Sequence, residues 1–108
     1  MNPLEYDQES DSAYVRISSK PPYITAELSE RIGVDISISG GVVGVEILDA
    51  SKVISDLFGQ NISRNEVSKL LCKVSEKDAV YLNFELGTKK ASLAIPKAYQ
   101  SPALTLPG

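Results

Sequence analysis

The sequence predicts an α+β fold: an antiparallel β-meander of about five strands, followed by a short helix, a second helix and a β-hairpin. Three observations support this prediction. Apolar and polar residues alternate with the period of a half-buried strand through most of the first half of the chain, and again over residues 80–95. Capping residues precede two segments whose apolar residues recur at helical spacing. The connections between successive strands are short, which favours neighbouring antiparallel strands.

The first three strands are separated by polar turns and prolines. Residues 4–6 and 13–17 predict a hairpin with an acidic tip. Pro21 and Pro22 end the second strand, because neither can donate a hydrogen bond to a neighbouring strand. Residues 23–28 alternate again and predict the third strand.

The fourth and fifth strands show the clearest alternation in this half. The fourth strand is expected to bury four apolar residues: Ile32, Val34, Ile36 and Ile38. Gly40 and Gly41 then allow a tight hairpin turn. On the fifth strand Val43, Val45 and Ile47 are expected to face one side.

A helix is expected to follow the fifth strand directly. The Asp49 carboxylate is placed to accept hydrogen bonds from backbone N–H groups of the first turn. One apolar stripe follows, and Gly59 ends the helix; the stripe consists of Val53, Ile54, Leu57 and Phe58. Because so short a helix is unstable alone, the stripe is expected to lie on the sheet.

The second helix is indicated by Ser63 and Glu66, which have the spacing of a capping box. Apolar residues at helical spacing extend it to Val74 and place Cys72 on its surface. A hairpin follows, with strands at residues 80–86 and 91–95. Residues 97–108 predict an extended arm or a disordered tail.

Length and composition indicate a single domain, residues 1–108, in which residues 3–59 form the meander and first helix and residues 60–96 the second helix and hairpin. One cysteine and no apolar run of membrane-spanning length predict a cytoplasmic protein. The absence of histidine removes the commonest general base and zinc ligand. We therefore assign no catalytic residue and expect no cofactor.

Charge divides unevenly along the chain. Residues 1–60 carry four Lys or Arg against ten acids, and residues 61–108 carry seven against four. The basic residues of the second half are too scattered to favour a nucleic-acid partner. The candidates are Arg64, Lys69, Lys73, Lys89, Lys90 and Lys97.

Two stretches resemble the patterns of a known family. Residues 6–18, YDQESDSAYVRIS, resemble its opening pattern, and residues 44–51, GVEILDAS, resemble its closing pattern. The family is a small prokaryotic domain of unknown function. The resemblance covers residues 4–55, about half of the chain, and implies the same meander without an accepted activity. Some relatives are thought to be encoded beside small toxin-like proteins, which implies an antitoxin-like partner role as an alternative.

The acidic tip offers three candidate metal ligands: Asp7, Glu9 and Asp11. Carboxylate oxygens are the ligands that Ca²⁺ and Mg²⁺ prefer. Together with Glu46 and Asp49, the acids of this hairpin make a divalent-metal-dependent hydrolase an alternative function. The pattern favours a solvated turn, whose side chains bond their own backbone, over a metal site. Glu46 would then pair with Arg16 across the sheet.

Cys72 is interpreted as a helix-surface or interface cysteine. Lys69 and Lys73 would lower the pKa of its thiol. Without a histidine, however, no base partner is evident.

The function favoured by these observations is a non-enzymatic, self-associating protein-interaction module, with a homodimer or another protein as partner. A sheet of about seven strands has two faces, and two short helices cover only one of them. The uncovered apolar face, or an edge strand, is then expected to contact a second copy.

Overall fold

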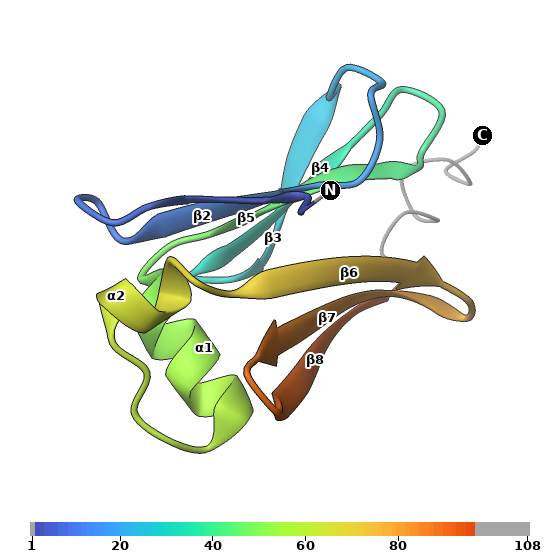
Figure 1. Ribbon diagram of the computed structural model, residues 1–108. Coiled ribbons are helices and arrows are strands. Elements are labelled where there is room, and N and C mark those ends of the chain that lie inside the picture. The colour runs from blue at the N-terminus through green and yellow to red at the C-terminus, as the bar shows by residue number, and fades with distance from the viewer. Residues whose placement is uncertain (1, 97–108) are drawn as a thin grey trace.

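The computed structural model describes residues 2–96, which form two antiparallel sheets and two helices (Figure 1). The first sheet consists of β1 (Leu4–Asp7), β2 (Ser12–Arg16), β3 (Ile24–Ser29), β4 (Ile32–Ile36) and β5 (Val42–Ile47). Next come α1 (Ala50–Phe58) and α2 (Arg64–Val67), and the second sheet consists of β6 (Leu71–Glu76), β7 (Ala79–Leu86) and β8 (Lys89–Pro96). The α+β prediction is confirmed. The predicted tail, residues 97–108, lies outside the described residues.

The strand order of the first sheet, β1-β2-β5-β4-β3, is not that of a simple meander. Val45 on β5 pairs with Val15 on β2 and with Val34 on β4. After β2 the chain crosses to the opposite edge through residues 17–23. The physical reason is burial: β5 is buried at every residue except Glu46 and takes the centre, whereas β3 is half-buried or exposed throughout and forms an edge.

The two sheets bury their apolar faces against each other in one core. Val15, Val34 and Val45 of the first sheet and Leu82 and Phe84 of the second are fully buried and belong to the same cluster. Figure 1 shows the sheets as two layers with the helices together at one end. The expectation of an uncovered apolar face is therefore wrong, because the C-terminal strands form a second sheet that covers it.

The second helix is much shorter than predicted. α2 ends at Val67, and the segment expected to continue it is strand β6. Apolar residues in this segment fit both helical spacing and alternation, since Leu70 and Cys72 are buried while Leu71 is exposed. Pairing with β7 along the whole of β6 favours the strand.

The prediction that Ile38 is buried on the fourth strand is also wrong. β4 ends at Ile36, where its register with β5 shifts. The chain then turns, and the Ile38 side chain is 75% exposed instead of buried.

Candidate functional site

The acidic tip is a closed turn held by its own side chains. Asp7 Oδ1 accepts a hydrogen bond from the backbone N–H of Glu9 at 3.1 Å, and Oδ2 accepts one from the Ser10 hydroxyl at 2.8 Å. The bond from Ser10, followed by that from Glu9, holds the pKa of the Asp7 carboxyl below its usual value. Asp7 therefore acts as the Asx-type turn residue that the sequence allowed as an alternative.

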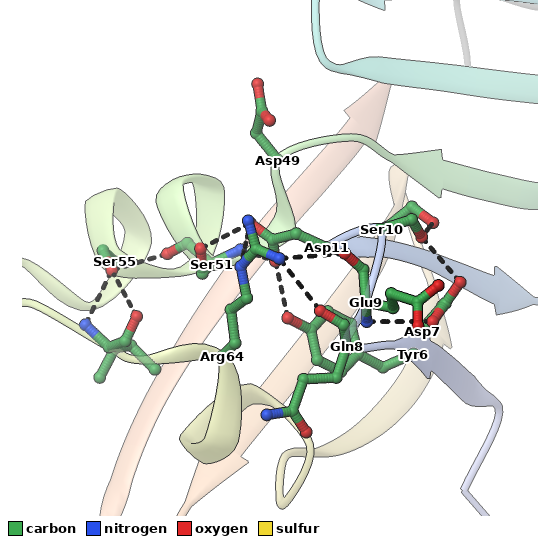
Figure 2. Close-up of polar contacts among 12 residues, drawn as sticks. Tyr6, Asp7, Gln8, Glu9, Ser10, Asp11, Asp49, Ser51, Ser55 and Arg64 are labelled. Carbon is green, nitrogen blue, oxygen red and sulfur yellow. Dashed lines mark hydrogen bonds and ion pairs between the residues drawn. The ribbon is translucent and has the colours of Figure 1, made fainter.

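Asp11 faces the interior and caps α1 from a distant part of the chain. It is 5% exposed and has a left-handed backbone, with φ of 54°. Its carboxylate accepts hydrogen bonds from the N–H of Ser51 at 3.0 Å and from the Ser51 hydroxyl at 2.7 Å. The Tyr6 hydroxyl donates a third bond at 2.6 Å (Figure 2). Three donors thus converge on one buried carboxylate.

Asp49 does not cap the helix, so that prediction is wrong. Its backbone is left-handed, with φ of 49°, and its side chain makes no capping hydrogen bond. The carboxylate instead accepts a hydrogen bond from Arg31 Nε at 3.0 Å. Figure 2 shows it pointing away from the cluster around Asp11. Asp11 instead supplies the hydrogen-bond acceptor for a backbone N–H group in the first turn of α1.

Arg64 at the start of α2 binds the same turn from the other side. Its Nη1 donates to the carbonyl oxygens of Gln8 and Glu9, at 3.2 and 3.1 Å. Its Nε lies 3.8 Å from Asp11 Oδ2. A basic residue considered for nucleic-acid binding therefore holds the β1–β2 turn against α2.

The pKa values of this cluster follow from burial and hydrogen bonding. Burial alone would raise the pKa of the Asp11 carboxyl, but the bonds from Tyr6 and Ser51, with the Arg64 charge, outweigh it and lower the pKa. Burial and the hydrogen bond to Asp11 raise the pKa of the Tyr6 hydroxyl. Asp11 is thus kept ionised as an acceptor and Tyr6 protonated as its donor.

The acids considered for metal binding are not brought to one point. Asp11 faces Ser51, and Asp49 faces Arg31. Asp7 and Glu46 do line one open pocket of about 290 Å³ on the outer face of the first sheet. Over residues 2–96, however, no three His, Cys, Asp or Glu side chains are grouped so that they could hold a metal ion.

A second polar network crosses the outer face of the first sheet and was missed by sequence reasoning. The Tyr14 hydroxyl on β2 donates to Asp35 Oδ2 on β4 at 2.8 Å, and the Thr25 hydroxyl on β3 donates to Asp35 Oδ1 at 2.6 Å. The tyrosine passes over Gly44 of β5, where an added Cβ would lie only 1.8 Å from the Tyr14 hydroxyl oxygen. A lone glycine inside a strand is the signal that marks such a close approach.

Tyr14 of this network has a raised pKa and contacts Arg16. Burial and then the bond to Asp35 raise the pKa of Tyr14 to about 12. Arg16 lies over the Tyr14 ring and 3.8 Å from Glu5, so the predicted pair with Glu46 is wrong. Glu46 lies opposite Tyr14 and Gly33 instead.

Cys72 lies in the core on β6 and not on a helix surface. It is 3% exposed, and burial raises the pKa of its thiol to about 11. The nearby lysines do not activate it, because alternation along β6 puts Lys73 on the exposed face. Cys72 therefore packs as a small apolar residue.

The first sheet also carries an exposed apolar corner, made of Pro21, Pro22, Tyr23, Ile24 and Ile38. Tyr23 is 68% exposed, Ile24 43% and Ile38 75%. Both prolines, Tyr23 and Ile38 line an open pocket of about 430 Å³ beside the start of β3. In the part of the chain that the structure describes, the other large exposed apolar side chains are Leu48 and Leu71.

No helix among residues 2–96 is long and apolar enough to cross a membrane.

Comparison with known proteins gives one match, in the N-terminal half. No curated protein and no solved structure matches the chain. The match runs from the first residue of β1 to Ser51, the residue that Asp11 caps. Residues 4–51 match the family described as "Protein of unknown function (DUF2283)", which confirms the resemblance seen in the sequence.

Proposed function

We propose that this protein is a non-enzymatic, self-associating protein-interaction module of the cytoplasm. The observation that carries the proposal is the apolar corner. Exposed apolar patches on a folded domain mark interaction sites more often than scattered single residues do. Three of the five large exposed apolar side chains of the described residues lie in this corner.

The surroundings of the corner are polar, which sets it apart. Lys20, Ser37 and Ser39 line the pocket at this corner. On the outer face of the sheet, Thr25, which follows Ile24, pairs with Asp35. Burying one large apolar side chain contributes about 1.5–3 kcal/mol. Tyr23 and Ile38 keep most of their surface in water within a single chain, and a contacting surface would gain that contribution.

The position of the corner favours a second copy as the partner. It lies at the start of β3, which is an edge of the first sheet. The edge of a sheet is a common site for pairing with another chain. A two-fold interface uses the same surface on both copies, so one exposed edge is sufficient.

Sedimentation velocity over a range of micromolar concentrations tests the proposal. The wild-type chain is expected to form a dimer in a concentration-dependent way. Replacing both Tyr23 and Ile38 by serine is expected to weaken association by about tenfold or more, because two apolar side chains no longer enter the interface.

Leu71→Ser is the matched control, since Leu71 is 53% exposed but lies on the second sheet. It is expected to associate like the wild type. A wild-type chain that is monomeric at every concentration contradicts the proposal. If Leu71→Ser weakens association as strongly as the double variant, the contact lies on the second sheet and not at the corner.

A further inference from the structure

We propose that the apolar corner binds an extended, proline-containing apolar segment, and that its occupant is residues 97–108 of the same chain (the arm). The arm and a second copy then compete for one surface. This inference rests on the proposed function, because it specifies what regulates self-association through the corner. It is carried by two adjoining pockets, by the place where β8 ends and by the sequence of the arm.

Two adjoining pockets lead from the second sheet to the corner. The pocket of the corner, of about 430 Å³, includes Lys20 and Ser37 in its lining. A neighbouring pocket of about 280 Å³ contains the same two residues in its lining, together with Val42, Val43 and Val80. Ser18, Gly41 and Glu76 complete that lining. Because the two linings share residues, an extended segment that starts beside Val80 has a continuous path to the corner.

β8 ends beside the first part of this path. Ile95 pairs with Val80, and Pro96 pairs with Ala79. β8 therefore ends next to the β6–β7 turn, which Figure 1 shows at the same end of the molecule as the β4–β5 turn and away from the helices. Twelve residues span up to about 40 Å when extended, which is ample for two adjoining pockets of this size.

The arm has the composition of a segment that binds in such a groove. Only its first residue is charged, and Leu104 and Leu106 stand between Pro102 and Pro107. Proline fixes the backbone and removes a hydrogen-bond donor, so this sequence favours an extended conformation over a helix or a central strand. Extended proline-containing segments bind grooves that are lined by aromatic side chains. The corner offers such a lining in Tyr23 and the two prolines before it.

Tethering favours the arm of the same chain over a second copy as the occupant. A tethered arm meets its own corner at an effective concentration of about millimolar, whereas a second copy is present at about micromolar concentration in sedimentation. An occupied corner is not available to a second copy, so the apparent affinity between copies falls with the fraction of free corners. The arm thus sets the concentration at which copies associate.

Sedimentation velocity of a full-length arm variant tests the competition. Leu104→Ser combined with Leu106→Ser removes the large aliphatic side chains of the arm and leaves residues 2–96 unchanged. Self-association is expected to become about tenfold tighter, because a larger fraction of corners is free. Thr105→Ser is the matched control, since it changes the side chain between the two leucines and keeps both. It should associate like the wild type.

A nitroxide spin label on the arm tests the contact itself, in isotope-labelled protein that is diluted until it is monomeric. The label is attached to full-length Ser101→Cys, and the native Cys72 is buried and reacts little. The amide signals of Tyr23 and Ile38 are expected to be broadened more strongly than in the same spin-labelled chain with both leucines of the arm replaced by serine. A mixture of spin-labelled chain with isotope-labelled chain that carries no spin label should show no such broadening, because the contact lies within one chain.

The two measurements separate this inference from the proposed function. Equal or weaker association of the double serine variant overturns the competition. Equal broadening with and without the two leucines, or broadening in the mixture, overturns binding of the arm to its own corner. If every chain is monomeric at all concentrations, the proposed self-association fails, and the spin-label comparison alone decides whether the arm occupies the corner.

Discussion

The two sheets of this protein are specified in different ways. In the second sheet each strand pairs with its neighbour in the chain: Leu82 on β7 lies between Val74 of β6 and Leu93 of β8. In the first sheet the strand order departs from the chain order, and polar contacts join distant residues, as between Asp11 and Ser51. Short turns are sufficient to fix the register of successive strands. A sheet with a crossover gains specificity from buried polar groups that are satisfied in only one arrangement.

The largest predicted effect tests whether these two sheets fold as one unit. Phe84 is fully buried on β7 and belongs to the core shared by both sheets. Phe84→Ala is expected to lower the free energy of unfolding by about 3–5 kcal/mol. Because the core is shared, near-UV circular dichroism, to which Tyr6 and Tyr14 of the first sheet and Tyr81 of the second contribute, should follow the same transition as far-UV circular dichroism.

Leu71→Ala, at an exposed position on the neighbouring strand, is the control and should change stability by less than about 0.5 kcal/mol. If the tyrosine signal of Phe84→Ala survives to a higher temperature than the far-UV signal, the two sheets are separate cooperative units and the shared core does not couple them.

The next effect compares two aspartates at the start of α1. Asp11→Asn leaves the Ser51 and Tyr6 donors with a weaker acceptor in a buried site, and we expect a loss of about 3 kcal/mol. Asp49→Asn removes only an exposed ion pair with Arg31 and should cost less than about 1 kcal/mol. Urea denaturation of both variants makes the measurement. Equal losses, or a larger loss for Asp49→Asn, would contradict the assignment of Asp11 as the cap.

The pH dependence of stability follows from the same carboxylate. The pKa of Asp11 is lowered in the folded protein, so its contribution is fully present above the unfolded value of about 3.9 and is lost as pH falls through the folded pKa. Wild type should therefore lose stability below about pH 4 more steeply than Asp11→Asn. Parallel pH profiles of the two proteins would contradict this assignment.

These contacts also show how far the sequence could predict the fold. Alternation located the strands of the first sheet and the β7–β8 hairpin, because each of these strands has one apolar face, but it did not locate β6. It could not supply the order, since a period of two identifies a face and not a neighbour. Asp49 occupies the usual capping position, whereas the actual cap, Asp11, precedes Ser51 by 40 residues. The segment from Leu70 to Val74 fits both spacings, and only its partner β7 favours the strand.

A smaller effect is expected at Gly44, under the Tyr14 ring. Gly44→Ala places a Cβ where the tyrosine lies, so the ring must move and its bond to Asp35 is lost, at a cost of about 1–3 kcal/mol. In a Tyr14→Ala background the space is free, and the same substitution should be neutral or slightly stabilising. A double-mutant cycle by urea denaturation measures this coupling. Additive effects would show that the ring does not require the glycine.

The smallest effect concerns the N-terminal cap of α2, which leads into the second sheet and which the sequence located correctly. Ser63 Oγ accepts from the N–H of Glu66 at 3.2 Å, and the Glu66 carboxylate accepts from the N–H of Ser63 at 3.0 Å. Ser63→Ala should cost about 1 kcal/mol, the usual contribution of a helix cap. α2 is only one turn long, but it places Val67 and Leu70 in the core directly before β6. Chemical denaturation of Ser63→Ala beside Ser63→Asp, which keeps a capping oxygen, makes the comparison. If Ser63→Ala is as stable as Ser63→Asp and the wild type, the cap is dispensable and the second sheet alone positions α2.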